Sequence, residues 1–236
     1  MPEDVHCEGL PTAIPDLASR IERLLARQKL NPRQRILIAL AGVPGSGKST
    51  VSSAVLAELE ARRVGDVAVV PMDGFHYTQK MLSTFSDPEH AFRRRGAPFT
   101  FDAQSCVELV GRLQVMKVTA YDEPEVHILA PSFDHALKDP VVNDICISSR
   151  TRLVVIEGNY TLLNQRPWSE IAEVCRERWF VDAPVEIVRQ RLAKRHVAAG
   201  IEDSMAAAIH RAEENDIPNG ELIRSLLIEP DVTIVN

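Results

Sequence analysis

Short, mostly apolar runs recur along the 236-residue chain, at residues 36–41, 67–70, 153–156, 178–181 and 231–235. Such runs are typical of strands buried on both faces, as in a parallel sheet. The segments between several of them have helical periodicity and are long enough to cross over between parallel strands. The pattern therefore predicts an α/β fold with a doubly wound, parallel, five-stranded sheet flanked by helices.

Helical spacing also predicts elements outside the sheet. Leu17, Ile21 and Leu24 lie on one face of a predicted N-terminal packing helix over about residues 15–30, which starts at Pro15. Asp102 is a suitable N-cap for another helix. Two segments, about 76–101 and 119–140, have no clear period, and we expect loop-rich insertions there.

The composition is that of a globular protein, with 45 % hydrophobic and 25 % charged residues. We predict a single domain over residues 1–236, since no repeat or linker marks a boundary. The four cysteines lack the spacing of a zinc site or disulfide framework. A formal net charge of −6 gives no overall attraction to nucleic acid or anionic membranes. With an acidic start and no bilayer-spanning run, the sequence predicts a cytoplasmic protein with a small-molecule partner and leaves its oligomeric state open.

Residues 42–50, GVPGSGKST, match the phosphate-loop pattern G-x-x-x-x-G-K-[ST]. An apolar run precedes the motif and a helix-compatible segment follows it, which is the context this motif requires. Lys48 would reach the outer phosphates, Ser49 would ligate Mg²⁺, and the helix N-terminus would face the same anion. We therefore predict that the phosphates of a nucleotide bind to Gly42, Val43, Pro44, Gly45, Ser46, Gly47, Lys48, Ser49 and Thr50.

A carboxylate follows the second apolar run, in the segment Pro71-Met72-Asp73-Gly74-Phe75-His76-Tyr77. Ligands of parallel sheets bind beyond the carboxyl ends of the strands, so Asp73 should lie beside the phosphate loop. There it could orient an acceptor hydroxyl and take its proton late in phosphoryl transfer. An Asp-Gly turn without a function is the alternative. His76 and Tyr77 are candidate substrate contacts.

The two insertions carry further candidate acceptor contacts. Arg94 and Arg95 belong to a run of three arginines, which would either bind an anion or form a solvated face. Tyr121 and Asp134 lie in the second insertion, where aromatic and acidic side chains can recognise a small polar molecule but are also ordinary in loops.

Two more groups complete the predicted site. Glu157 ends the third apolar run and resembles a Walker B carboxylate, which makes it the second candidate ligand of Mg²⁺. Arg191 and Arg195 are spaced i, i+4 on a predicted helix, so both could close over a transferring phosphoryl group. A basic, solvent-facing helix end is the alternative.

The segments GVPGSGKST, PMDGFHY, RRRGAPFTFD, PSFDHALKDP, VVIEGNY and RLAKRHVAAG together resemble the uridine kinase, phosphoribulokinase and pantothenate kinase superfamily of phosphate-loop kinases. The resemblance extends over about residues 35–235. It implies a nucleoside-monophosphate-kinase-like core with a lid over about residues 189–203, ATP as the donor and Mg²⁺ as the cofactor. It also implies that Asp73 is the catalytic base and that Arg191 and Arg195 are lid cations.

The predicted activity is an ATP-dependent transfer of the γ-phosphate to a hydroxyl of a small metabolite. Asp73-Gly74-Phe75-His76 is nearer to the pantothenate kinase pattern than to the nucleoside kinase pattern, while PSFDHALKDP matches neither. The acceptor therefore stays open between a nucleoside such as uridine and a pantothenate-like or sugar-like alcohol. The alternative is a nucleotide-hydrolysing switch or ATPase that acts on a protein partner. Against it, the chain has neither an Asn-Lys-x-Asp motif nor a Leu-Ser-Gly-Gly-Gln motif.

Overall fold

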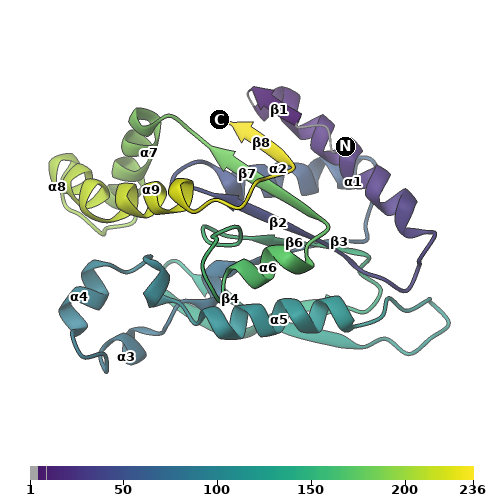
Figure 1. The fold of residues 1–236 in the computed structure, drawn as a ribbon. Coiled ribbons are helices and arrows are strands. Elements are labelled where there is room, and N and C mark those ends of the chain that lie inside the picture. Colours follow the sequence, from purple (N-terminus) through teal and green to yellow (C-terminus); the bar gives the residue numbers. More distant parts are fainter. Residues whose placement is uncertain (1–4, 9) are drawn as a thin grey trace.

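The computed structural model describes residues 5–8 and 10–236, with side chains from residue 11 onward. Its main sheet is parallel throughout and has the strand order β1-β8-β7-β2-β6-β3 (Figure 1). The predicted five strands are confirmed, and a sixth, β1, is added at one edge. In sheet order the strands are β1 (Val5–Glu8), β8 (Val232–Val235), β7 (Glu177–Asp182), β2 (Ile36–Gly42), β6 (Leu153–Glu157) and β3 (Val67–Pro71).

The central strand β2 is apolar at every position because both of its faces are covered. Leu37 and Ala39 pack into the core on the side of α5 and α6, whereas Ile38 and Leu40 pack into the core on the side of α1 and α2. This alternation is the two-residue period of a strand. It explains why β2 has no polar residues, as expected for a buried parallel strand.

The register brings the carboxyl ends of the strands to one edge. Leu40 pairs with Glu157, which in turn pairs with Pro71 on β3. On the other side of β2, Gly42 pairs with Val181. The residues that directly follow β2, β3 and β6 are therefore neighbours, although they are far apart in the chain.

The first helix differs from the prediction at its start. α1 spans Leu10–Gln28 and contains Pro15, at which the sequence predicted the first turn. Proline is favoured in the first turn because it lacks an N–H, and Pro11 occupies that place here. Pro15 lies only one turn further on, where it removes a single helical hydrogen bond. The predicted buried face, with Leu17, Ile21 and Leu24, is confirmed.

Both predicted insertions contain more regular structure than expected. The first includes the short helices α3 (Gln79–Leu82) and α4 (Pro88–Arg93). Part of the second forms an antiparallel hairpin of β4 (His127–Asp134) and β5 (Asp139–Ser148). The tight turn between these strands does not stand out in the sequence, because the residues that flank it are polar. The hairpin packs on the η1 turn (Met72–Phe75), where the Pro131 backbone fills the space that a side chain at residue 74 would need.

The remaining helices lie on both sides of the sheet (Figure 1). α2 (Lys48–Ala61) follows the phosphate loop, and α5 (Ala103–Val115) starts after Asp102, whose carboxylate accepts the Ser105 N–H as predicted. α6 (Ser169–Val174) and α5 cover the face opposite α1 and α2. α7 (Val185–Ala198) leads to α8 (Met205–Arg211), a π-helical turn (Ala212–Asp216) and α9 (Ile217–Ser225).

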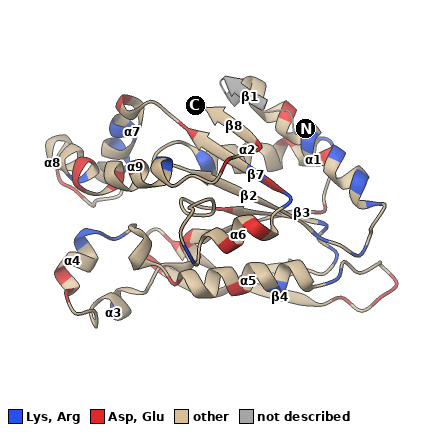
Figure 2. Cartoon of the chain, viewed as in Figure 1, with Lys and Arg blue, Asp and Glu red and all other residues tan. Residues whose placement is uncertain are grey.

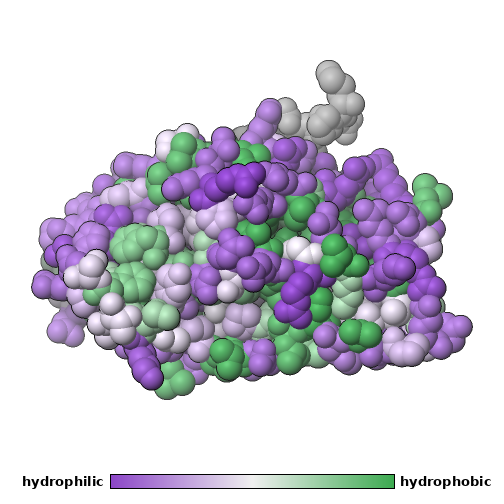
Figure 3. Space-filling view, turned by 60° about the horizontal axis from the view of Figure 1, so that its bottom comes forward, coloured by the Kyte–Doolittle hydropathy of each residue, from purple (hydrophilic) through white to green (hydrophobic). Residues whose placement is uncertain are grey.

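The surface seen in Figure 3 mixes hydrophilic residues with smaller hydrophobic groups. Within the residues that the structure describes, no helix has both the length and the apolar character needed to cross a bilayer.

Candidate active site

The phosphate loop lies between the end of β2 and the start of α2. Gly42 has no room for a side chain, since a Cβ there would lie 2.7 Å from both the Ser46 hydroxyl and the Val181 carbonyl oxygen. Gly45 and Gly47 have φ angles of 76° and 92°, which are favourable only for glycine. Lys48, Ser49 and Thr50 form the first turn of α2. The loop therefore has the compact form that the motif predicts for Gly42 to Gly47.

Two side chains from distant elements contact this loop. Asn236 donates from Nδ2 to the Ser46 carbonyl oxygen at 2.7 Å. Arg191, on α7, donates to the same oxygen at 3.4 Å and to the side chain of Asn236 at 3.5 Å. Asn236 was not predicted, because an asparagine after the last strand carries no motif. It holds Arg191 next to the phosphate loop.

Glu157 and Ser49 face each other across the end of the sheet. The Ser49 hydroxyl donates to Glu157 Oε1 at 3.1 Å, and Glu157 is only 8 % exposed. Burial raises the pKa of the Glu157 carboxyl, the charge of Lys48 lowers it, and the charge of Asp73 raises it. Lys48 precedes Ser49, and Asp73 lies two residues after Pro71, which pairs with Glu157 on the neighbouring strand. The four residues Lys48, Ser49, Asp73 and Glu157 therefore lie at the same edge of the sheet, where the sequence predicted them.

The donor atoms of this cluster fit Mg²⁺, which prefers hard oxygen ligands and keeps sites open for phosphate and water. The Ser49 hydroxyl and the Glu157 carboxylate supply two such oxygens, close to the phosphate loop. Within the described residues there is no group of three or more His, Cys, Asp or Glu side chains that could hold a metal. The site thus suits a cation that arrives with the phosphates of a nucleotide.

Next to Asp73, His76 is packed between two aromatic rings. Its ring lies 3.9 Å from that of Phe101 and 4.8 Å from that of Phe133, measured between centroids. Its Nδ1 is 2.8 Å from the Asp73 carbonyl oxygen, so Nδ1 carries the hydrogen that is donated. Burial lowers the pKa of His76, which favours the neutral ring. His76 therefore lies near the predicted base and fixes the backbone of the turn that carries it.

Arg95 and Tyr77 serve mainly to attach the first insertion to the hairpin. Arg95 donates to the Tyr77 carbonyl oxygen at 3.1 Å and forms an ion pair with Asp139 at 3.0 Å. It also donates to the carbonyl oxygen of Lys138. A carboxylate thus already neutralises Arg95. The structure gives Arg95 a structural role in place of the predicted free cation for a substrate.

Arg94 points the other way and meets only neutral partners. Its Nε donates to Asn215 at 3.1 Å, and an Nη donates to Asn219 at 3.2 Å. Both asparagines are almost fully buried, and the π-helical turn ends between them. The sequence contained no motif for this pair. Polar residues spaced i, i+4 within an otherwise helical stretch were the one available signal.

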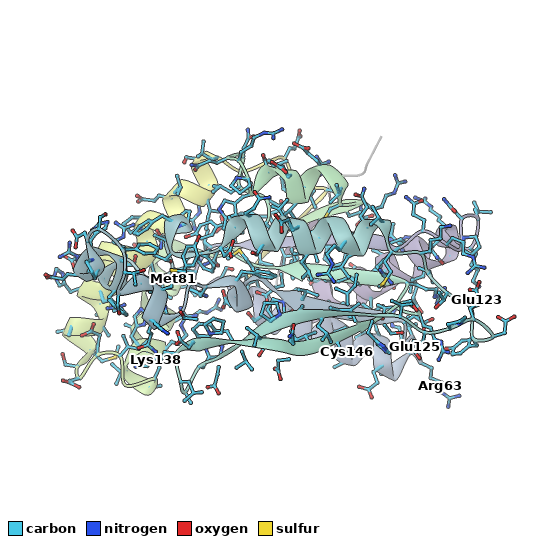
Figure 4. The ribbon with its side chains drawn as sticks, turned by 90° about the horizontal axis from the view of Figure 1, so that it is seen from below. Arg63, Met81, Glu123, Glu125, Lys138 and Cys146 are labelled. Atoms are coloured by element: carbon cyan, nitrogen blue, oxygen red, sulfur yellow. The ribbon has the colours of Figure 1, made fainter. Side chains whose placement is uncertain are left out.

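Two predicted substrate contacts do not join the site. The Tyr121 ring lies under the guanidinium group of Arg150. Val118, three residues before Tyr121, donates its N–H to the carbonyl oxygen of Arg33, just before β2. Tyr121 is therefore at the amino edge of the sheet. In Figure 4 the neighbouring Glu123 and Glu125 lie at the opposite end of the molecule from Met81 and Lys138.

Asp134 is the second of these residues. Its carboxylate accepts the N–H groups of Ala136 and Leu137 at 2.8 and 3.0 Å and thereby closes the hairpin turn. These bonds lower the pKa of Asp134. Asp134 is a turn residue here, because two backbone donors lie within its reach.

The two predicted lid arginines differ in their surroundings. Arg191 contacts the phosphate loop, as described above. Arg195, one turn later on α7, is exposed, and its side chain forms no hydrogen bond or ion pair within the described residues. Figure 2 shows that basic residues occur on α7 and at the end of α4. Arg191 is thus already placed at the loop, whereas Arg195 forms no hydrogen bond with it in this structure.

Comparisons with known proteins agree with this architecture. The model of the phosphoribulokinase / uridine kinase family matches residues 37–209. A Schizosaccharomyces pombe protein named as a candidate uridine kinase, C227.14, is 40 % identical over 96 % of this chain and 94 % of its own length.

Solved structures extend the comparison. A candidate fructose transport system kinase from Silicibacter sp. TM1040 is 30 % identical with a TM-score of 0.75, covering 92 % of this chain and 98 % of its own. YFH7 from Saccharomyces cerevisiae shares the fold with a TM-score of 0.79 at 24 % identity, covering 94 % of this chain and 99 % of its own. The family match covers most of the chain and includes the phosphate loop, Asp73, Glu157 and Arg191. The chain therefore belongs to the phosphoribulokinase and uridine kinase family.

Proposed function

We propose that this protein is an ATP-dependent kinase that transfers the γ-phosphate to a hydroxyl of a small metabolite. The observation that carries the proposal is the cluster of Asp73 and Glu157 with Lys48 and Ser49 of the phosphate loop. Two carboxylates beside a phosphate site match the division of labour in phosphoryl transfer, in which one serves the metal ion and the other orients the nucleophile.

The loop residues Gly42 to Thr50 bind the phosphates through backbone N–H groups, and Lys48 binds the outer ones. Ser49 and Glu157 hold Mg²⁺, which neutralises charge on the phosphates when bound. Asp73 accepts a hydrogen bond from the acceptor hydroxyl and takes its proton. The hydroxyl oxygen forms a bond to the γ-phosphorus while the bond to the β-phosphate bridging oxygen breaks, and ADP leaves.

Arg191 and Arg195 supply positive charge to the γ-phosphate, with residues 189–203 acting as a lid. The contact of Arg191 with Ser46 supports the first of these roles. His76 and Arg94 are the candidate acceptor contacts nearest to this cluster. The names of the relatives differ in the acceptor, uridine in one and fructose in another, so they do not single out one for this chain.

The test is ADP release from Mg-ATP with a panel of uridine, pantothenate, fructose and ribulose 5-phosphate, for the wild type and for Asp73→Asn. We expect a rate that depends on one acceptor and falls by roughly 10²–10⁴ in the variant, the usual contribution of a positioned base. ATP binding should be unchanged, because Asp73 acts on the acceptor. Full activity in Asp73→Asn would refute its role as base. Hydrolysis that ignores every acceptor but rises with a protein partner would instead favour the switch.

A further inference from the structure

A cavity of about 380 Å³ lies between α4 and the segment that joins α8 to α9. It is therefore bounded on one side by the first insertion and on the other by the helices that follow α7. Most of its charged groups are basic, and Figure 2 shows the basic end of α4 on this side of the molecule. The residues that line it are His90, Arg93, Arg94, Arg211, Glu214 and Asn215.

Arg94 is the best-positioned cation of this cavity. Its side chain donates to the side-chain oxygens of Asn215 and Asn219, which accept hydrogen bonds but carry no charge. A guanidinium has five N–H donors, so three remain for a ligand. The two asparagines hold the group in place at little cost in entropy, because both are buried, at 4 % and 3 % exposure. Arg94 is thus a fixed positive charge that has no ion pair with a carboxylate among the described residues.

The other charges of the cavity do not cancel this one. Glu214 is more than half exposed and forms no ion pair with Arg94 within the described residues, while Arg211 lies 3.6 Å from Glu202. Arg93 is close only to His90, at 3.5 Å. Arg93 and Arg94 are therefore left as two neighbouring guanidinium groups without an acidic partner, which is the arrangement that binds oxyanions.

The cavity is also within reach of the predicted base. The buried Tyr160 donates to the Gly96 carbonyl oxygen at 2.5 Å, two residues after Arg94. Burial is the main cause of the raised pKa of Tyr160; the charges of Asp216 and Asp73 raise this pKa further, and the charge of Arg94 lowers it. The Phe101 ring lies 5.6 Å from the Tyr160 ring and 3.9 Å from the ring of His76, three residues after Asp73. The segment that carries Arg94 and the turn that carries Asp73 therefore meet at these rings, and one small molecule could reach both.

We propose that this cavity is the subsite for an anionic group of the acceptor, so that the acceptor is a small alcohol bearing a carboxylate or a phosphate. Arg94 and Arg93 bind the oxyanion, and Asp73 receives the hydroxyl at the other end of the molecule. Asn215 and Asn219 are positioning residues that orient Arg94. A neutral nucleoside or sugar would leave these guanidinium groups without a partner. The assignment of the anion to an acceptor rests on the proposed kinase function, whereas the existence of an anion-binding subsite does not.

The subsite can be tested without turnover by using inorganic phosphate as the probe. The phosphate loop is first blocked with Mg-ADP, and added phosphate is then titrated by ³¹P line broadening. We expect one remaining phosphate site in the wild type, which is lost in Arg94→Gln. Arg112→Gln removes an arginine from α5, outside the cavity, and should leave that site intact. Absence of a second phosphate site in the wild type, or its survival in Arg94→Gln, would overturn the proposal.

Asn219→Asp provides a sharper variant. The aspartate keeps an oxygen that accepts the hydrogen bond from Arg94, but its negative charge neutralises the guanidinium group. The substitution also removes the amide N–H that donates to Asn215 at 3.5 Å. A merely structural role for Asn219 predicts unchanged phosphate binding, since the bond to Arg94 survives. Our proposal predicts a loss comparable to that in Arg94→Gln, with a cooperative thermal transition confirming that the variant is folded.

Matched acceptor pairs then identify the class. Pantothenate is compared with its neutral alcohol pantothenol, and ribulose 5-phosphate with ribulose, by kcat/KM for ADP release. We expect the charged member of one pair to be preferred by roughly 100-fold, as for sites that lose a buried polar partner, and the preference to collapse in Arg94→Gln. Preference for the carboxylate or for the phosphate distinguishes the two sources of the anion.

The two experiments separate the two proposals. If only the neutral acceptors, pantothenol or ribulose, were phosphorylated, the proposed kinase function would stand and the proposed anion subsite would be refuted. If phosphate binding depended on Arg94 but no acceptor stimulated ADP release, the anion subsite would stand and the proposed kinase function would be refuted.

Discussion

The Ser49 hydroxyl donates a 3.1 Å hydrogen bond to Glu157 Oε1, which links the first turn of α2 to the end of β6. The two residues are 108 positions apart in the chain. They meet because β2 and β6 are adjacent parallel strands whose carboxyl ends reach the same edge. The contact joins the phosphate loop to the carboxylate proposed for the metal ion.

Replacing Glu157 by Gln should stabilise the nucleotide-free protein while impairing Mg-nucleotide binding. Burial raises the pKa of Glu157, so its charged form costs folding free energy. Since the folded-state pKa is above the unfolded one, this carboxyl favours the fold at low pH and loses that contribution as the pH rises through the folded pKa. We therefore expect Glu157→Gln to raise Tm by about 2 °C at pH 7.5.

The same difference in Tm should vanish near pH 4, where both proteins carry a neutral side chain at residue 157. Thermal unfolding at the two pH values and titration with Mg-ADP measure both effects. A lower Tm for Glu157→Gln at pH 7.5 would contradict the sign of this argument.

Gly47→Ala should weaken nucleotide binding. Gly47 has φ of 92°, and an added Cβ would overlap the Asn236 side chain. The left-handed conformation alone costs about 1–2 kcal/mol for a residue with a Cβ. We expect the affinity for ADP to fall about tenfold or more, measured by calorimetric titration.

Gly65→Ala is the matched control for this change. Gly65 has open space around its Cβ position and no positive φ. Its stability should change by no more than about 0.5 kcal/mol, with normal ADP affinity. Equal behaviour of the two alanine variants would argue against a strained phosphate loop.

Replacing Arg191 or Arg195 by alanine should have different effects on ATP affinity. Arg191 already contacts the loop at Ser46, so Arg191→Ala is expected to weaken ATP binding and to lower kcat. The side chain of Arg195 forms no hydrogen bond or ion pair within the described residues, so Arg195→Ala should lower kcat with little effect on ATP affinity. We expect a fall in kcat of roughly 10²–10³ in each, at the lower end for arginines that stabilise a transferring phosphoryl group.

Lys194→Ala is the control, because Lys194 is an exposed cation on the same helix. It should retain the wild-type kcat and ATP affinity. If Lys194→Ala reduced kcat as much as Arg195→Ala, the effect would come from the general charge of α7 and not from a placed arginine.

Arg35 should matter for stability alone. It is 3 % exposed, and burial lowers its pKa to about 10. Its guanidinium donates to the carbonyl oxygens of Thr151, Leu113 and Ser148 at 2.8, 2.9 and 3.2 Å. Arg35→Ala leaves these oxygens unpaired, so we expect a loss of about 2–4 kcal/mol in urea unfolding.

Arg35 lies at the amino edge of the sheet, opposite the proposed site, so the folded fraction of Arg35→Ala should keep its ADP affinity. Arg112→Ala, on the exposed side of α5, should unfold like the wild type. A loss of ADP affinity without a loss of stability would contradict this assignment.

Strand-end residues were predictable because local signals determine them. An apolar run that is buried on both faces must belong to a parallel sheet, and the residue that follows it must lie at the carboxyl edge. Asp73 and Glu157 were placed correctly for this reason, and the glycines of the phosphate loop follow from the backbone angles they must adopt.

Loop residues were not predictable in the same way. Tyr121 and Asp134 are of residue types that are common in binding sites. In the structure, however, Tyr121 lies at the amino edge of the sheet, and the Asp134 carboxylate is bonded to the N–H groups of its own hairpin turn. Arg94 and Arg95 are adjacent in the chain and equal in charge, yet Asp139 neutralises Arg95 while Asn215 and Asn219 leave Arg94 charged.

The sequence by itself thus determined the parallel sheet, the phosphate loop and the strand-end carboxylates, since each depends on residues that are close in the chain. Only the tertiary structure decided which arginine is free to bind an anion, since that depends on partners 44 to 125 residues away. The residue type determines the charge of a side chain, but whether that charge is available to a ligand depends on the neighbours that folding brings to it.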